Sequence, residues 1–526
     1  MKIPWRTAFI AGIGLLTCSA GATSWSAEPE VSPPSFLSGW TSAGSDLHDS
    51  YSQPGELVLN RRTVARLAKR WALSTEGSIV TTPAVVGSDL YVPDTKGWLY
   101  RINAYTGEIL WKKKVSDYSG SEASYSRTTP AISGNMLVIG DRTAGAIYGI
   151  NRSSGQLIWR QLLDNTAGAL ITGSAVIAQD RVYVGVSSQQ ESLAWKKNYI
   201  LTFRGQVAAL DLHTGAIVWQ FRTVPKGYTG GAVWSSTQAI DLQHNSLYVT
   251  VGNNYAVPVP VSTCQHEAKS LAAQLACASP DDHYDSMLAL NLADGKLRWS
   301  RILQGPDAWT IDCAIKMPVG VACPPPVGPD YDFGSGPNLY TVGFGRKARQ
   351  VVGAGQKSGA YWELDATDGQ TVWARQVGPG GPLGGIVWGT ATDGVQVYSG
   401  IGNSNHVLTH LVPSNKAVTG GFWSAMNAAT GKILWQTQAI GFDPAVPGKT
   451  ATAAGAVSTA GSVVYGEDDA GHFVALDAVD GSILWKFRSG GSPSAAPAIV
   501  DGSLYWSTTG VSGTSKLYAF SLPGSL

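Results

Sequence analysis

The stretch LYRINAYTGEILW, residues 99–111, decides the fold, because its pattern recurs through most of this chain. Two runs of alternating apolar residues flank a polar residue and Gly107, and the unit ends at Trp111. A Gly between two alternating runs is typical of a β-hairpin, because Gly adopts a positive φ at no steric cost. The stretch therefore predicts two antiparallel strands joined by a tight turn.

Six more segments share this pattern, and in every one a Gly lies four residues before the closing Trp. These segments end at Trp159, Trp219, Trp299, Trp373, Trp435 and Trp485. Repeats at intervals of about 40 to 50 residues are typical of β-propellers, in which each four-stranded blade packs against the next. We therefore expect these Trp residues to pack between blades and to have no role in binding a ligand.

Both ends of the chain carry an incomplete copy of the unit. Trp71 ends the stretch LNRRTVARLAKRW (59–71), which lacks the Gly turn, and LYAFSLP (517–523) resembles a unit without its ending. A ring whose first and last strands share one blade produces this split and leaves no open sheet edge. The sequence thus predicts an all-β, eight-bladed β-propeller with tryptophan-docking repeats over residues 56–526, with seven blades as the alternative.

The composition argues against one class of partner. Only 14% of the 526 residues are charged, against roughly 25% in an ordinary soluble domain, and the net charge is +1. No basic run stands out in the sequence. We therefore expect no nucleic-acid partner, because such binding depends on clustered positive charge.

The first residues resemble an export signal. Two basic residues precede an apolar run over residues 7–18, and Ala-Gly-Ala (20–22) offers small side chains at a cleavage site. The apolar run is too short to cross a bilayer comfortably, and no second one follows. We therefore predict a signal peptide over residues 1–22, an N-terminal extension over 23–55, no membrane span, and a periplasmic or secreted location.

Four cysteines follow the signal segment and fall into two near pairs, Cys264 with Cys277 and Cys313 with Cys323. Export places these residues in an oxidising compartment, where local disulfides are expected. Free or metal-bound thiols are the alternative, although neither pair has a Cys-x-x-Cys spacing.

The ending [Thr/Ser/Asp]-Gly-x-x-x-Trp resembles the tryptophan-docking motif of quinoprotein alcohol dehydrogenases, which depend on pyrroloquinoline quinone (PQQ). The resemblance covers roughly residues 40–526 and looks closest to the polyvinyl-alcohol-dehydrogenase-like branch. It implies a flat tricyclic quinone with three carboxylates, bound over the ring axis beside a divalent metal. Non-catalytic outer-membrane assembly propellers share the repeat, so a protein-binding scaffold of the cell envelope is the alternative function.

Two loop residues match the metal ligands of that family. The run SSQQE (187–191) resembles its Ser-Ser-x-x-Glu segment, which makes Glu191 the carboxylate ligand, with Gln190 as an alternative register. Gly252-Asn253 resembles its Gly-Asn turn after a strand, which makes Asn253 the amide ligand. Oxygen ligands of these types suit Ca²⁺, with a lanthanide as the alternative ion.

Five further residues match, or lie in settings similar to, the family's contacts with PQQ. Trp234 follows Gly-Gly-Ala-Val and offers an aromatic plate for stacking, and Trp388 occupies a similar setting two blades later. Lys357 precedes a Gly turn, as does the basic residue that contacts the quinone in the family. Arg127 sits where the family places an Arg near a PQQ carboxylate, and Thr172 matches a position that hydrogen-bonds PQQ.

The family's catalytic base, an Asp that takes the proton of the alcohol, is represented by several candidates. The segment GPDYDFG (328–334) resembles the family's Asp-Tyr-Asp segment, which favours Asp330 or Asp332 as the base, with the other near the metal. Asp307 and Asp312 are held in reserve, because they lie nearer to where the family's Asp would be expected.

The chain departs from the family in three respects. It lacks the adjacent Cys-Cys pair of many members, and it offers only Thr81 and Thr82 where many members place a Glu. It has no Cys-x-x-Cys-His haem motif, so electrons should leave to a separate carrier such as a cytochrome c. The resemblance therefore implies a PQQ- and Ca²⁺-dependent dehydrogenase of primary or secondary alcohols, with polymeric alcohols among the candidate substrates.

Overall fold

The computed structural model describes one compact unit that begins within the predicted extension. The described residues are 39–235, 237–315, 323, 325–492, 495–510 and 515–524. The predicted signal peptide lies outside the described residues, as does the first part of the predicted extension.

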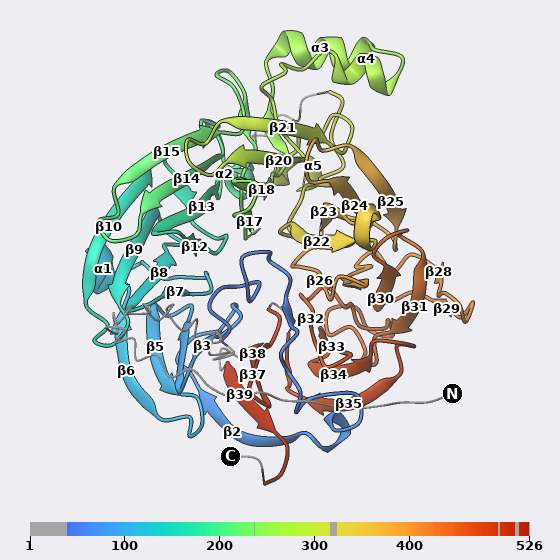
Figure 1. Ribbon diagram of the computed structural model, residues 1–526. Helices are drawn as coiled ribbons and strands as arrows, with labels where there is room; N and C mark the ends of the chain where they lie inside the picture. The colour runs from blue at the N-terminus through green and yellow to red at the C-terminus, as the bar shows by residue number, and fades with distance from the viewer. Residues whose placement is uncertain are drawn as a thin grey trace, which may run out of the picture. The chain divides into compact units, whose positions relative to one another are not determined.

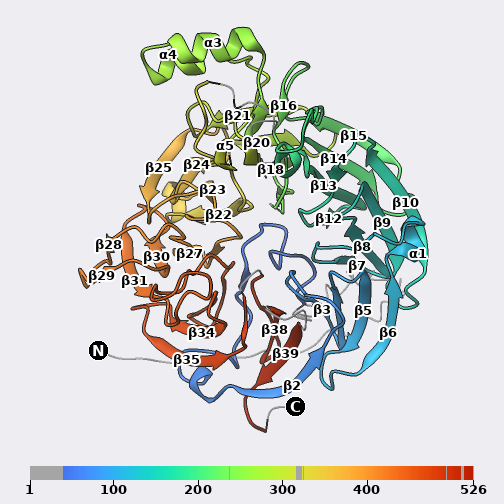
Figure 2. The ribbon, with the colours of Figure 1, turned by 180° about the vertical axis from the view of Figure 1, so that it is seen from behind.

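Eight four-stranded antiparallel blades follow one another around a central axis (Figure 1), and the view from behind shows the same ring (Figure 2). The predicted eight-bladed β-propeller is confirmed. Blades 1 to 4 are β3 (Ala84–Val86), β4 (Asp89–Pro93), β5 (Trp98–Asn103) and β6 (Ile109–Lys114); β7 (Ala131–Ser133), β8 (Met136–Gly140), β9 (Gly145–Asn151) and β10 (Leu157–Asp164); β12 (Val176–Ala178), β13 (Arg181–Ser188), β14 (Gln206–Asp211) and β15 (Ile217–Arg222); and β17 (Ala239–Asp241), β18 (Ser246–Thr250), β20 (Ser286–Asn291) and β21 (Leu297–Ile302).

The other half of the ring has the same construction. Blades 5 to 8 are β22 (Asn338–Val342), β23 (Arg349–Gly355), β24 (Ala360–Asp365) and β25 (Thr371–Gln376); β26 (Ala391–Thr392), β27 (Gln396–Ile401), β30 (Phe422–Asn427) and β31 (Ile433–Gln438); β32 (Ser458–Ala460), β33 (Val463–Asp468), β34 (His472–Asp477) and β35 (Ile483–Arg488); and β37 (Ala498–Val500), β38 (Ser503–Gly510), β39 (Lys516–Ser521) and β2 (Ala68–Ser74). Outside these blades lie the short strands β1 (Ser52–Gln53), β11 (Ala169–Leu170), β16 (Thr229–Gly230), β19 (Asn254–Ala256), β28 (Thr409–His410), β29 (Ala417–Val418) and β36 (Gly491–Ser492) and the helices η1 (Val64–Arg66), α1 (Ser116–Ser119), α2 (Gln190–Leu193), α3 (Val259–Glu267), α4 (Leu271–Leu275), α5 (Ile311–Ile315) and η2 (Gly345–Lys347).

The two ends of the chain meet in blade 8, as the incomplete repeats predict. Its outer strand β2 comes from the N-terminal side and pairs antiparallel with β39, so that Trp71 lies opposite Ala519. Trp485, in the outer strand of blade 7, donates its indole N–H to the carbonyl of Leu67 at 3.0 Å. The ring is therefore sealed by ladder hydrogen bonds between residues more than four hundred positions apart.

The docking tryptophans explain the fixed spacing between Gly and Trp in the repeat. Trp219 donates its indole N–H to the carbonyl of Leu292 in the next blade at 2.9 Å. Its ring lies against Gly295, where a Cβ would approach the ring to 2.5 Å. The same indole-to-carbonyl bond joins Trp71 to Ala104, Trp159 to Leu212, Trp299 to Ala366, Trp373 to Ala428 and Trp435 to Ala478. Each Gly turn thus leaves the space that the Trp of the preceding blade fills.

Replacing Gly295 by Ala should lower the free energy of unfolding by about 2 to 5 kcal/mol, because strain at positive φ adds to overpacking. Gly295 has φ +70°, and a Cβ there would clash with the ring of Trp219. Gly394 is the matched control, since it has φ +81° but open space around its Cβ position. Gly394→Ala should therefore cost only about 1 to 2 kcal/mol. If urea unfolding shows the same loss of unfolding free energy for both variants, packing against Trp219 is not the reason that position 295 requires Gly.

A segment at the start of the described chain passes through the centre of the ring, where Figure 1 shows it in blue. Its carbonyl groups accept hydrogen bonds from the innermost strands of six blades. The pairs are Trp40 with Val85, Thr41 with Ile132, Leu47 with Ile240, His48 with Leu339, Ser50 with Thr392 and Tyr51 with Thr459. The segment also bonds to blade 8, because the side-chain amide of Gln53 donates to the carbonyl of Ile499 at 3.3 Å. Residues 40–53, which we call the inner segment, therefore tie seven of the eight blades to one another.

The long insertions in the middle of the chain extend from the ring. The helices α3 and α4 lie between β19 and β20 and project outward from the rim (Figure 1). Cys264 bonds to Cys277 across these helices, and Cys313 bonds to Cys323 beside α5, so both predicted disulfides are confirmed. No helix in the described part of the chain is long and apolar enough to cross a membrane.

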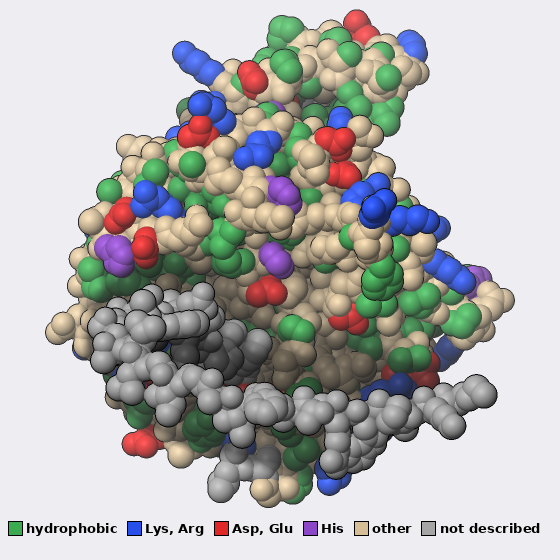
Figure 3. Space-filling model, in the orientation of Figure 1, with side chains coloured by type: hydrophobic (Ala, Val, Ile, Leu, Met, Phe, Trp, Pro, Cys, Tyr) green, Lys and Arg blue, Asp and Glu red, His purple; other side chains and the backbone are tan. Residues whose placement is uncertain are grey.

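The charged side chains are distributed in keeping with the low net charge. On the face of the ring seen in Figure 3, Lys, Arg, Asp and Glu side chains are interspersed among uncharged ones. Positive and negative side chains are therefore mixed over the described part of this face.

Candidate functional site

Three of the candidate residues follow the second strand of neighbouring blades. Glu191 follows β13, Asn253 follows β18 and Lys357 follows β23. Because equivalent strands of all blades run in the same direction, the residues that follow them meet on one face of the ring. The sequence repeat therefore places these side chains around a common position beside the axis.

A cavity of about 180 Å³ lies at this position, and we call it the site cavity. Six of the sequence-predicted residues line it together. They are Arg127, Thr172, Glu191, Trp234, Asp332 and Lys357. They come from blades 2 to 5 and from the loops between them, so the ring brings together residues that lie far apart in the sequence.

Lys357 lies at the centre of a buried charge cluster. Its Nζ is 2.6 Å from Oδ1 of Asp332 and 2.9 Å from Oδ1 of Asp330. It also lies 5.4 Å from the centre of the Trp234 ring. Trp234 in turn donates its indole N–H to the other oxygen of Asp332 at 2.6 Å. These contacts hold the plane of the Trp234 ring against the acidic side of the cavity.

Burial and crowding change the proton affinities of this cluster. Burial and the neighbouring charge of Asp332 raise the pKa of Asp330 to about 9, against the opposing effect of Lys357. Burial raises the pKa of Glu191 to about 7, with Lys357 opposing the shift and Asp332 adding to it. Burial lowers the pKa of Lys357, but the surrounding carboxylates outweigh it and hold that pKa above its usual value. A cation bound here would favour the ionised carboxylates, because opposite charge stabilises them.

Asp307 acts on the backbone beside the cavity. Its oxygens accept the N–H groups of Asp330 at 3.1 Å and Tyr331 at 2.7 Å, which fixes the turn where Asp330 has φ +60°. Burial raises the pKa of Asp307 to about 6, against the backbone hydrogen bonds that lower it. Its carboxyl group also meets that of the fully buried Asp285, whose pKa burial and Asp307 raise well above the usual range. Asp307 therefore supports this turn through its two hydrogen bonds to the backbone.

The structure distinguishes between Glu191 and Gln190, the two residues considered as the metal ligand of this loop. Gln190 is committed to loop packing, because its Oε1 accepts the N–H groups of Thr202 and Phe203 and its amide donates to Ala167. Glu191, by contrast, faces the site cavity and accepts no hydrogen bond from any described residue. The geometry therefore favours Glu191 as the residue with free oxygen atoms.

Four other candidates are not among the residues that line the cavity, namely Asn253, Asp307, Asp312 and Asp330. Asn253 is buried, and its amide nitrogen donates to the carbonyls of Asn254 and Trp309, both at 3.0 Å. These bonds leave the amide oxygen pointing away from the two carbonyls, which orients it as an acceptor or ligand. Asp312 is buried in α5 and is not among the residues that line the cavity.

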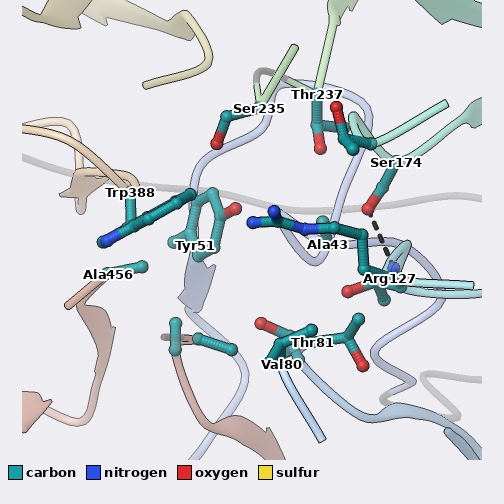
Figure 4. Close-up of a pocket in the computed structure, with 15 residues that line it drawn as sticks. Ala43, Tyr51, Val80, Thr81, Arg127, Ser174, Ser235, Thr237, Trp388 and Ala456 are labelled. Carbon is teal, nitrogen blue, oxygen red and sulfur yellow. Dashed lines mark hydrogen bonds between the residues drawn. The ribbon is translucent and has the colours of Figure 1, made fainter. Parts of the chain in front are cut away.

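A second cavity adjoins the first along the ring axis, and we call it the axial cavity (Figure 4). Arg127 and Thr172 line both cavities, and Trp388 lines the axial one. The rings of Trp388 and Trp234 meet edge to face, with centroids 5.7 Å apart and planes at 83°. Arg127 lies 5.6 Å from the centre of the Trp388 ring, and Figure 4 shows its guanidinium group pointing toward Tyr51 and Trp388.

Other predicted positions fit around these two cavities. Thr172 donates its hydroxyl to the carbonyl of Trp234, so it holds the backbone of the aromatic plate. Thr81 and Thr82, which stand where many family members have a Glu, line the axial cavity. The two threonines that replace the family's Glu therefore line the same cavity as Arg127.

Among the residues of the site cavity that sequence reasoning missed are an arginine and a tyrosine, Arg142 and Tyr255. The repeat could have indicated Arg142, because this residue lies two positions after Gly140, which ends β8. Lys357 lies two residues after Gly355 at the end of β23. The two cations therefore occupy equivalent positions in blades 2 and 5. Tyr255 has no such signal, since its strand β19 lies outside the blades.

The site fits a flat, anionic, aromatic ligand accompanied by a cation. The Trp234 ring offers a stacking surface, Arg127 and Lys357 offer positive charge, and Glu191 offers oxygen atoms without hydrogen-bond donors. Within the described ranges, no group of three or more His, Cys, Asp or Glu side chains could hold a metal ion. A cation would therefore need an amide oxygen such as that of Asn253, or oxygen atoms of a ligand, besides a carboxylate.

Comparisons with known proteins agree with this fold. The sequence model of a protein family described as outer membrane protein assembly factor BamB matches residues 15–197, 68–267 and 421–522. A polyvinylalcohol dehydrogenase of Pseudomonas sp. is 27% identical over 490 residues, which cover 88% of this chain and 69% of that protein. A polyvinylalcohol dehydrogenase of Sphingopyxis sp. (strain 113P3) is 28% identical over 462 residues, which cover 82% of this chain and 64% of that protein.

Among solved structures, the quinohemoprotein alcohol dehydrogenase of Comamonas testosteroni is similar to this chain with a TM-score of 0.69. The sequence identity is 18%, and the match covers 93% of this chain and 81% of that one. This likeness shows a shared fold. The chain spans about two-thirds of the length of the two polyvinylalcohol dehydrogenases.

Proposed function

Because this chain belongs to the family of repeat propellers whose model is described as outer membrane protein assembly factor BamB, and its relatives include polyvinylalcohol dehydrogenases, we propose that it is an alcohol dehydrogenase that uses PQQ and a divalent cation. One observation carries the proposal. A single cavity joins an aromatic plate, Trp234, to cations at Arg127 and Lys357 and to the free carboxylate of Glu191. A ring that served only as a protein scaffold would have no use for this convergence of charge on one cavity.

The residues of the site divide into a metal side and a cofactor side. Glu191 and the amide oxygen of Asn253 would hold the cation, for which Ca²⁺ is the proposed identity and a lanthanide the alternative. Trp234 would stack on the quinone, and Lys357, whose charge Asp330 and Asp332 already balance, would donate a hydrogen bond at its edge. When bound, PQQ supplies an ortho-quinone that accepts a hydride from the alcohol carbon.

Asp330 is the proposed base, with Asp332 as its support. Both oxygens of Asp332 are engaged, one with Lys357 and the other with the indole of Trp234. Asp330 bonds to Lys357 through Oδ1 only, and no described residue donates a hydrogen bond to its second oxygen. Burial gives Asp330 a high proton affinity, so an ionised Asp330 would take the proton of the alcohol hydroxyl readily. Asp307 would keep it in place through the backbone.

The proposed substrates are primary or secondary alcohols. Polymeric alcohols are included because the two relatives of this chain are named polyvinylalcohol dehydrogenases. Electrons would pass to a separate carrier, for which a cytochrome c is the proposed partner, since the sequence holds no Cys-x-x-Cys-His motif. Export to the periplasm or beyond, which rests on residues 1–22, belongs to the same proposal.

The purified protein, incubated with PQQ and Ca²⁺, should reduce an artificial electron-acceptor dye when an alcohol is added. The panel should contain primary and secondary alcohols and polyvinyl alcohol, with lanthanum replacing Ca²⁺ in a parallel series. Omission of PQQ, of the cation or of the alcohol provides the controls. If PQQ neither binds nor supports dye reduction under any of these conditions, the dehydrogenase proposal fails and a scaffold role becomes the better interpretation.

A further inference from the structure

Two arginines face the site cavity without an acidic partner. Arg127 and Arg142 both line it, and no ion pair or hydrogen bond joins either guanidinium group to another described residue. Buried or half-buried arginines normally pair with a carboxylate, because an unpaired charge is costly to remove from water. Two of them in one cavity therefore call for a negatively charged ligand.

The carboxylate nearest to Arg142 in the sequence is already used elsewhere. Asp141 is fully buried. One of its oxygens accepts the N–H and the hydroxyl of Thr143, and the other accepts the hydroxyl of Tyr148 at 2.6 Å. With Asp141 occupied, Arg142 is left to face the cavity as an unneutralised cation.

The backbone holds the two arginines in proximity. The N–H of Arg142 donates to the carbonyl of Tyr125 at 2.8 Å, which joins the turn after β8 to the segment that carries Arg127. Burial, and in second place the charge of Arg142, lower the pKa of Arg127. The fold thus brings two like charges together, and only an anion between them would relieve the repulsion.

The two sides of the site cavity differ in charge. Lys357 is neutralised by Asp330 and Asp332, whereas Arg127 and Arg142 have no such partners among the described residues. The acidic side suits a cation, and the arginine side suits the carboxylates of a flat ligand. PQQ carries three carboxylates on its rings, so it can place one between the arginines while Trp234 covers a face of its rings.

We propose that Arg142, together with Arg127, forms a paired-arginine site that binds a carboxylate group of the quinone cofactor. This inference rests on the proposed function and adds a binding residue to it. Arginine suits the role because its planar fork can donate two parallel hydrogen bonds to one carboxylate. The site would orient the cofactor by its acidic end and leave the quinone end toward Lys357.

The test is a titration of the full-length protein with PQQ at fixed Ca²⁺ concentration, followed by quenching of tryptophan fluorescence. Arg142→Gln should weaken binding by roughly tenfold to a hundredfold, as expected for the loss of a charge-assisted hydrogen bond. Arg142→Lys keeps the charge but not the fork, so its affinity should fall between those of the wild type and Arg142→Gln. Arg346→Gln, an exposed position in η2 before the start of β23, is the matched control and should bind as the wild type does.

A second ligand separates charge recognition from a general loss of structure. The trimethyl ester of PQQ has the same rings but no carboxylates, so wild type and Arg142→Gln should bind it equally. Equal affinities of both proteins for PQQ itself would overturn the inference while leaving the proposed function intact. An Arg142→Gln defect of the same size with the ester would overturn it as well. Failure of the wild type to bind PQQ would overturn both proposals.

Discussion

Lys357→Met should lower the free energy of unfolding by about 3 to 5 kcal/mol near neutral pH, because it leaves buried carboxylate charge without its cation. The Nζ of Lys357 lies 2.9 Å from Asp330 and 2.6 Å from Asp332, and the three side chains are almost completely buried. Urea unfolding of the protein without added PQQ or metal measures this effect. We expect a lower midpoint with an unchanged slope, since the surface exposed on unfolding stays the same.

The pH dependence of this loss has a definite sign. The folded-state pKa of Lys357 is raised, so its contribution to stability is fully present below the unfolded pKa of about 10.4 and disappears only as the pH rises beyond it. The difference between Lys357→Met and wild type should therefore persist through the acidic and neutral range and shrink only as the pH rises beyond about 10.4. A deficit that is already absent at about pH 8 would contradict the ion-pair account.

The matched double variant isolates the pair. Lys357→Met combined with Asp332→Asn removes both charges, and the amide oxygen that this second substitution introduces can still accept the indole N–H of Trp234. The double variant should therefore be more stable than Lys357→Met alone, because replacing both partners of a buried pair costs less than removing one. If the two losses simply add, Lys357 does not stabilise the protein through Asp332.

Glu191→Ala should lower PQQ- and Ca²⁺-dependent dye reduction at least about a hundredfold, as expected when a metal ligand is removed. Glu191 is the carboxylate of the cavity that no described residue engages by a hydrogen bond. Its removal takes away oxygen atoms that nothing else in the loop replaces. Steady-state rates at saturating alcohol measure the effect, and Glu108→Ala, at an exposed turn in blade 1, is the control.

A binding measurement distinguishes lost ligation from lost structure. Burial raises the folded-state pKa of Glu191 to about 7, so the ionised group makes the fold less stable as the pH rises from its unfolded pKa toward 7. Glu191→Ala without ligands should therefore be at least as stable as wild type at about pH 8. The increase in melting temperature that PQQ and Ca²⁺ give the wild type should be absent. A variant that keeps this increase would remove Glu191 from the metal site.

The repeat made the ring and part of the site predictable. Trp71 without a Gly turn and the unfinished unit at residues 517–523 were enough to predict the shared closing blade. Glu191, Asn253 and Lys357 could be singled out because the short segments around them resemble motifs of the family, and the structure shows that each follows the second strand of a blade. A repeat fixes where such positions lie around the axis, whatever residue occupies them. Arg142 stands at the position equivalent to Lys357 and could have been found by the same reasoning.

Other features of the site and of the ring could not be predicted from one sequence. Asp285 and Asp307 lie in different segments, and the raised pKa of Asp285 depends on the burial that only packing creates. The inner segment has no alternating pattern, because it bonds to the ring mostly through backbone carbonyls. Every residue offers the same carbonyl whatever its side chain, so no side-chain pattern predicts these contacts.

The inner segment also constrains the order in which the protein can assemble. The carbonyl of Tyr51 accepts the N–H of Thr459, and the side-chain amide of Gln53 donates to the carbonyl of Ile499, which lies 446 residues further along the chain. Contacts of such sequence separation are slow to form, since a long loop must close before they contribute any stability. A growing chain could fold blades 1 to 6 one after another, yet the inner segment would wait for blades 7 and 8. Synthesis of these two blades, more than the folding of any earlier one, should therefore be the event that completes the native state.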